Sequence, residues 1–143
     1  MVNIIIGSTP KPLASEELTK YFQMHSDLEG YLYIGYPIIG TVEGAYPIDA
    51  LWISRERGLV IFNLVENKSI EGYEEIQDDC ANKVESKLKG YKQLVDKRQL
   101  CVDINVITFA PSIGTLEEYN KDYPLCNANT LAKCISELEW KEQ

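Results

Sequence analysis

Histidine is nearly absent from this chain of 143 residues, which contains His25 alone. A zinc site with two histidines cannot be built from it, and zinc deaminases need a histidine together with a pair of cysteines. A Ser-His-Asp triad would depend on this one residue. We therefore expect any chemistry of the chain to come from carboxylates, amides and lysines.

Cysteine is also sparse, and the four cysteines show no C-x-x-C spacing: they are Cys80, Cys101, Cys126 and Cys134. A zinc site made from them is not expected, and a reducing compartment would keep them as thiols. Residues 1–7 lack the basic segment, the long apolar segment and the cleavage site of a signal peptide. The sequence thus predicts a cytoplasmic protein.

Basic residues and long apolar runs are the remaining shortages. The chain has 14 Lys and Arg against 22 Asp and Glu, which gives a net charge of −8. Because phosphate contacts by Lys and Arg drive most nucleic-acid binding, we expect the isolated domain to bind DNA weakly. No stretch approaches the roughly 18 apolar residues that a membrane span requires. The length fits one domain with a single core.

Hydrophobic periodicity predicts an α/β (α+β) fold with the order α-β-β-β-α-β-α and a mixed central sheet flanked by helices. Prolines at positions 10 and 12 favour an extended lead-in over 1–13, followed by one domain over 14–143. The run 59–65 is apolar on both faces, which is typical of a central strand. The expected helices cover 14–28, 71–98 and 129–140, and the expected strands cover 31–34, 48–54, 59–65 and 103–109.

Three polar residues stand where packing alone would place apolar ones. Asp49 and Asn63 lie inside expected strands, and Gln77 fills the vacant place between Tyr73 and Cys80 on the apolar stripe of the long helix. Burying an unpartnered polar group costs about 1–3 kcal/mol, so we expect the three to share one site. A buried hydrogen-bond network that only holds the strand register is the alternative.

The stretches around these residues resemble a known family. The element order and the segments 47–51, 59–65 and 73–77 resemble the nuclease-related (NERD) branch of the PD-(D/E)XK nucleases. Segments 30–40, 46–51 and 108–111 are similar to the amino-terminal domain of bacterial UvrD-like superfamily 1 DNA helicases. The resemblance implies a PD-(D/E)XK core over roughly residues 14 to 110.

The resemblance also implies a site in which an Asp and a Glu hold Mg²⁺ and a Lys steadies the attacking water. Asp49 matches the family Asp, but Asn63 stands in place of the Glu and Val65 in place of the Lys. With Gln77, these residues form a degenerate site, and we expect weak Mg²⁺ binding at Asp49 and no measurable cleavage. Glu66 and Lys68 form an alternative, displaced catalytic pair.

Glu17 is a further candidate, because many family members carry an additional acid on the first helix. An ordinary carboxylate near a helix start is the alternative interpretation of Glu17.

The implied function is a nuclease-like accessory domain, non-catalytic, that takes part in DNA repair by positioning a downstream helicase motor or a protein partner. ATP hydrolysis would lie in the parent helicase, because this chain lacks a Gly-x-x-x-x-Gly-Lys-Ser/Thr phosphate loop. Two alternatives remain open: an active metal-dependent DNA endonuclease, and a structural module whose acidic surface meets a basic protein.

The hairpin between the second and third expected strands fixes the geometry of the site. A three-residue loop at 55–57, with Gly58 in a left-handed conformation, would pair Ser54 with Gly58. In this register Asp49 lies opposite Asn63, and Glu66 points to the other face from Val65.

Overall fold

A computed structural model describes residues 2–9, 11–36, 38–41, 44–46, 48–55, 58–66, 69–89, 95–96, 99–100, 104–114 and 123–138. Its centre is a mixed sheet of six strands, in which β6 lies between β5 and β9. The six strands, in their order across the sheet, are β1 (Val2–Ile6), β2 (Gly30–Ile34), β5 (Ala50–Ser54), β6 (Gly58–Leu64), β9 (Ile104–Phe109) and β10 (Leu125–Cys126).

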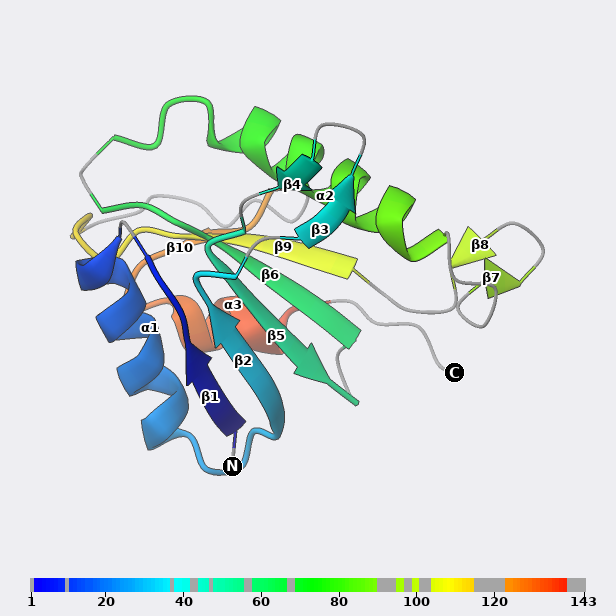
Figure 1. Ribbon diagram of the computed structural model, residues 1–143. Helices are drawn as coiled ribbons and strands as arrows, with labels where there is room; N and C mark the ends of the chain where they lie inside the picture. The colour runs from blue at the N-terminus through cyan, green and yellow to red at the C-terminus, as the bar shows by residue number, and fades with distance from the viewer. Residues whose placement is uncertain are drawn as a thin grey trace.

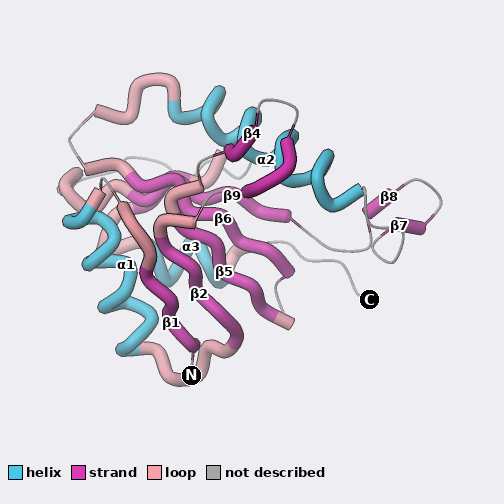
Figure 2. The backbone as a smooth tube through the Cα atoms, in the orientation of Figure 1, coloured by secondary structure: helices cyan, strands magenta, loops and turns pink. Residues whose placement is uncertain are grey.

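Helices cover both faces of this sheet (Figure 1). The helices are α1 (Pro12–Met24), α2 (Tyr73–Lys89) and α3 (Leu131–Ser136). Helices α1 and α3 contribute to one apolar core and α2 to the other, on the opposite face. Two small hairpins complete the described elements: β3 (Ile38–Thr41) with β4 (Gly44–Tyr46), and β7 (Val95–Asp96) with β8 (Gln99–Leu100). Figure 2 shows the β7–β8 hairpin apart from the main sheet, and the β3–β4 hairpin contacts α2.

Strand β5 is the one strand of the main sheet that runs against the others. It pairs antiparallel with β2 and β6, whereas the β1–β2, β6–β9 and β9–β10 pairs are parallel. The carboxyl ends of five strands and the start of β5 therefore lie along one edge of the sheet. Ligand sites of open α/β sheets are found at this edge.

The predicted central strand and its hairpin are confirmed. Ser54 pairs with Gly58, which has φ of 71°, the left-handed conformation that the loop needs. Val60, Ile61 and Phe62 are all buried, as expected for a strand covered on both faces. Alternation divides them between the two cores: Ile61 packs toward α2, and its neighbours pack toward α1 and α3.

The expectation of a lead-in over 1–13 is wrong, because β1 occupies part of this segment. Residues Val2–Ile6 pair in parallel with Gly30–Ile34 and extend the sheet by one strand. This pairing joins segments separated by the whole of α1, so no local pattern announces it. Pro12 is not part of the lead-in either, because it is the first residue of α1. Proline is favourable at this position, since the N–H that it lacks would have no partner within the helix.

The expected helices are all longer than the observed ones. Helix α1 ends at Met24 rather than residue 28, and α3 covers Leu131–Ser136 rather than 129–140, of which residues 139–140 lie outside the described residues. Helix α2 ends at Lys89, before a glycine, and Val95 forms a short strand instead of a further helical turn. The sequence predicted a longer helix because Val95, which lies in β7, happens to continue the helical spacing of apolar residues.

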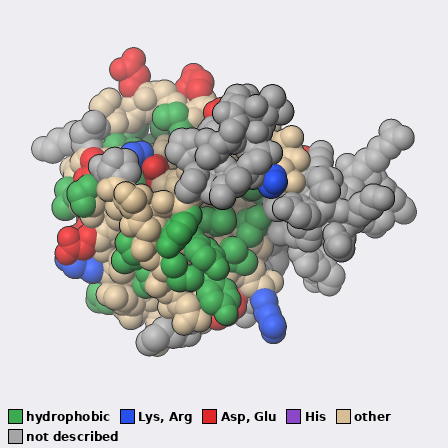
Figure 3. Space-filling view, viewed as in Figure 1, with side chains coloured by type: hydrophobic (Ala, Val, Ile, Leu, Met, Phe, Trp, Pro, Cys, Tyr) green, Lys and Arg blue, Asp and Glu red, His purple; other side chains and the backbone are tan. Residues whose placement is uncertain are grey.

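Hydrophobic side chains also gather on the outer surface of the sheet, over β2 and β5 (Figure 3). Tyr31 and Ile53 are neighbours in the β2–β5 register, and both are exposed. The polar candidates lie at a different place, at the carboxyl edge of the sheet.

Candidate functional site

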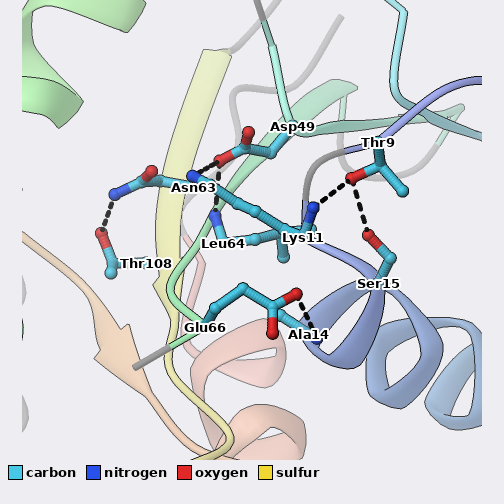
Figure 4. Close-up of polar contacts among 9 residues, drawn as sticks. All are labelled: Thr9, Lys11, Ala14, Ser15, Asp49, Asn63, Leu64, Glu66 and Thr108. Carbon is cyan, nitrogen blue, oxygen red and sulfur yellow. Dashed lines mark hydrogen bonds and ion pairs between the residues drawn. The ribbon is translucent and has the colours of Figure 1, made fainter. Parts of the chain in front are cut away.

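The candidate site lies where β6 ends, β5 begins and α1 starts (Figure 4). A cavity of about 370 Å³ opens there, between the end of β6 and the start of α2. The cavity has both polar and apolar walls, formed by Lys11, Asn63, Leu64, Val65, Glu66, Ser69, Ile70, Glu71, Tyr73 and Ile76.

Asp49 is held by two donors at this edge. The residue lies just before β5, and its Oδ2 accepts a hydrogen bond from the backbone N–H of Leu64 at 2.8 Å. The same oxygen forms an ion pair with Lys11 Nζ at 2.7 Å. Figure 4 shows the Lys11 side chain extending from the start of α1 to this carboxylate. The side chains of Lys11 and Asp49 are 30% and 20% exposed, so the pair is partly shielded from water.

Asn63 and Gln77 lie close together, as the sequence predicts, and a third residue, Thr108, connects them. Gln77 Nε2 donates to Thr108 Oγ1 at 2.8 Å and to the Pro124 carbonyl at 2.9 Å. Asn63 Nδ2 donates to the same Thr108 oxygen at 3.3 Å, because the parallel register places Asn63 beside Thr108. Gln77 is only 4% exposed, and Thr108 is fully buried. The expected inward orientation of Gln77 is thereby confirmed.

Asp49 does not join this network. The β5–β6 ladder ends at Ala50 and Phe62, one residue before the expected Asp49–Asn63 pair. In Figure 4 the Asn63 amide points toward Thr108, whereas Asp49 points toward Lys11 and Leu64. Asp49 therefore forms an ion pair with Lys11, whereas Asn63 and Gln77 belong to a separate network with the Thr108 hydroxyl. Both lie at the same edge of the sheet.

Glu66 has a structural role at the start of α1. Its Oε1 accepts a hydrogen bond from the backbone N–H of Ala14 at 3.2 Å, in the first turn of that helix. A carboxylate at this position is stabilised by the unpaired N–H groups and the positive end of the helix dipole. Lys68, its expected partner in a displaced catalytic pair, lies outside the described residues.

Glu17 lies away from this site in its observed contacts. It belongs to the second turn of α1, because the helix begins at Pro12 rather than at residue 14. Its carboxylate contacts Lys20 Nζ at 3.7 Å on the helix surface. This is the contact of an ordinary surface carboxylate.

The residues of the site do not fit a Mg²⁺ ion. Asp49 Oδ2 already accepts from Leu64 and faces the Lys11 ammonium, which holds the position that a cation would need. Asn63 supplies no charge, and Glu66 is turned to the α1 backbone. Mg²⁺ prefers six oxygen ligands in near-octahedral geometry, usually including a free carboxylate.

Lys11 and Thr108 are the members of the site that the sequence does not reveal. Lys11 comes from a segment between two prolines, and its partner Asp49 is 38 residues away. Thr108 carries one signal, because it is a polar residue inside a strand that is otherwise apolar from 106 to 110. Its role depends on the β6–β9 register, which only the folded sheet defines.

Among the described residues, no group of three or more His, Cys, Asp or Glu side chains is placed to hold a metal ion. No helix in the same part of the chain is long and apolar enough to cross a membrane. Comparison with protein-family models, with curated proteins and with solved structures finds no match for the chain.

Proposed function

We propose that this chain is a nuclease-like accessory domain that does not cleave DNA and that positions a helicase motor or another protein partner in DNA processing. A cytoplasmic location and a bacterial DNA-repair protein as the parent molecule belong to the same proposal. The proposal rests on the resemblance of the site segments to PD-(D/E)XK nucleases and on the chemistry of the site itself.

One observation carries the non-catalytic part of the proposal. The carboxylate that matches the family's metal-binding Asp is neutralised by Lys11 at 2.7 Å and is also held by the Leu64 N–H. In the nuclease chemistry this carboxylate must be free to bind Mg²⁺. Here the bound cation is an ammonium group of the chain, which supplies charge balance but activates no water.

The arrangement of the elements is compatible with the proposal. Helix α1, the antiparallel strands β2, β5 and β6, helix α2 and then β9 parallel to β6 follow the order that the resemblance implies. Strands β1 and β10 and the two small hairpins are additions to this order.

A plasmid-nicking assay tests the absence of cleavage. The purified chain is incubated with supercoiled DNA and either Mg²⁺ or Mn²⁺, and we expect the DNA to remain intact. Cleavage that disappears in Asp49→Ala and persists in Glu16→Ala, a surface carboxylate that pairs with Lys20, would refute the proposal and establish an endonuclease.

Calorimetric titration with Mn²⁺ tests the role given to Lys11. We expect millimolar or weaker binding by the wild type, and tighter binding by Lys11→Ala, because this change frees the Asp49 carboxylate. Lys20→Ala is the matched control, since Lys20 pairs with the surface carboxylates Glu16 and Glu17 of its own helix. Equal affinities of wild type and Lys11→Ala would show that Lys11 does not exclude a cation.

The partner role requires a binding measurement. The chain is mixed with a purified UvrD-like superfamily 1 helicase motor from the same source, and co-elution is followed by size-exclusion chromatography. Co-elution that also raises the unwinding rate of the motor is the expected result. Failure to bind the motor, together with an intact DNA substrate in the nicking assay, would leave the chain without the proposed accessory role.

A further inference from the structure

Two cysteines from different elements are buried in the same apolar core. Cys126 lies in β10 and is fully buried, and Cys134 lies in α3 and is 1% exposed. Helix α3 packs against β10, so the two side chains belong to one cluster. Both are free thiols in this structure.

The contacts between the two elements bring the Cys134 sulfur close to the backbone of β10, beside Cys126. Cys134 Sγ lies 3.8 Å from the carbonyl oxygen of Leu125, the residue that directly precedes Cys126. Interaction with the Cys134 side chain, together with burial, raises the pKa of Cys126, and the same interaction lowers the pKa of Cys134. Cys134 is therefore the better nucleophile of the pair, because the thiolate is the reactive form.

We propose that Cys126 and Cys134 are an oxidisable dithiol, which a peroxide converts into a disulfide that joins β10 to α3. In the first step the Cys134 sulfur attacks a peroxide oxygen, the O–O bond breaks, and a sulfenic acid and one water form. In the second step the Cys126 sulfur attacks the sulfenic sulfur, the S–S bond forms, and a second water leaves. Two thiols and one hydrogen peroxide thus give one disulfide and two waters.

The bridge would join β10 covalently to α3, a helix whose Leu131 and Ile135 are already buried in the apolar core. Helix α3 contains six residues, and the chain between the two cysteines is held by the Asn127 side chain. Asn127 also donates to the carbonyl of Ile113, so the same segment anchors the loop after β9. A helix of only six residues opens locally more readily than a central strand does. We expect such opening to admit the peroxide to the buried thiols.

Cys80 provides an internal control in the same molecule. It is also buried, but it lies in the other core, on α2, and its pKa is raised to about 12 by burial and by the nearby Asp49 and Asp79 carboxylates. A buried thiol with a raised pKa reacts slowly with peroxide. Burial alone therefore does not distinguish Cys80 from the pair, whereas the neighbouring thiol does.

The test is oxidation of the reduced protein with hydrogen peroxide, followed by thiol blocking in denaturant and mass spectrometry. The expected product has lost the mass of two hydrogen atoms, and peptide mapping links Cys126 to Cys134. Low urea, below the unfolding transition, should accelerate the reaction because it favours opening of α3.

Three variants complete the experiment. Cys134→Ser and Cys126→Ser should each abolish the bridge, whereas Cys80→Ser should form it as the wild type does. The peptide map of the wild type remains decisive if a buried serine prevents folding. A wild-type product without a disulfide, one oxidised only to sulfinic acid, or one with a bridge to Cys80 or Cys101 would overturn the proposal.

Discussion

At the scale of single residues, the site consists of polar groups that are partnered at every point where they are buried. Thr108 Oγ1 receives donors from both Gln77 and Asn63, and the Pro124 carbonyl receives Gln77 and the Thr108 backbone N–H. No described buried side-chain oxygen or nitrogen lacks a partner. Shared acceptors of this kind make the loss of any one donor tolerable.

Substitution of Gln77 tests this network. Gln77→Leu should lower the free energy of unfolding by about 1 kcal/mol, because Thr108 and Pro124 each keep another hydrogen bond. Gln77→Lys should cost about 3 kcal/mol or more, because it buries an unpaired charge. Urea denaturation measures both. Two variants as stable as the wild type would place Gln77 at the surface.

Cys80 makes stability depend on pH in the alkaline range. Its pKa is raised from 9.0 to about 12 by burial and by Asp49 and Asp79. The unfolded thiol therefore loses its proton first, so this contribution is complete below pH 9 and is lost as the pH rises toward 12. From about pH 8 to about pH 10 the wild type should lose on the order of 1 kcal/mol more than Cys80→Ala. Parallel pH profiles of the two proteins in urea denaturation would contradict the shift.

At the scale of elements, close backbone approach decides where glycine is required. Gly30 begins β2 with φ of 109°, and a Cβ there would overlap the carbonyl oxygen of Ile53 on β5. Gly72 precedes α2 with φ of 78°, but a Cβ there would meet only Glu75 Oε2 at 4.0 Å. The two glycines share a positive φ and differ in the space around them.

The pair Gly30→Ala and Gly72→Ala separates these two effects. Gly72→Ala should cost about 1 kcal/mol, the expense of a left-handed conformation for a residue with a side chain. Gly30→Ala should cost about 3 kcal/mol or more, because β2 must also move away from β5. Thermal and urea denaturation compare them. Equal losses would mean that the sheet accommodates the added carbon without strain.

Glu66 links the end of β6 to the first turn of α1. Glu66→Gln keeps an acceptor for the Ala14 N–H but removes the negative charge at the helix start, so we expect a loss of about 0.5 to 1 kcal/mol. Glu71→Gln is the control, because Glu71 lines the same cavity and is exposed. The difference between the two variants should shrink at high salt. A larger loss for Glu71→Gln would show that Glu71, and not Glu66, stabilises the start of α1.

At the scale of the whole molecule, charge determines which partners can approach. The net charge is −8, and α2 itself carries five acidic residues against three lysines, which are Lys83, Lys87 and Lys89. A continuous basic stripe along one helix is therefore missing from the described residues. Both facts predict that the chain attracts a polyanion such as DNA only weakly.

Fluorescence anisotropy with labelled single-stranded and duplex DNA checks this conclusion. At about 150 mM salt we expect no sub-micromolar binding by the isolated chain. An unrelated acidic protein of similar size is the comparison. Sub-micromolar affinity with a steep salt dependence would show that the positive groups are clustered after all.

Some features followed from neighbouring residues and were predictable from the amino-acid sequence by itself. A nearly continuous apolar run identified the central strand β6, helical spacing placed Gln77 on the buried face, and Gly58 set the β5–β6 register. These signals are local, because the positions that create them lie within a few residues of one another. The low histidine content and the negative charge likewise limited the chemistry independently of the fold.

Other features were decided only when distant segments met. The pairing of β1 with β2, the Lys11–Asp49 ion pair, the Thr108 acceptor and the contact of Cys134 with β10 all join different elements. A sequence pattern reports which face of an element is apolar, but not which element lies against it. Lys11 reaches Asp49 because it directly precedes α1, and the packing of this helix on the sheet sets that position.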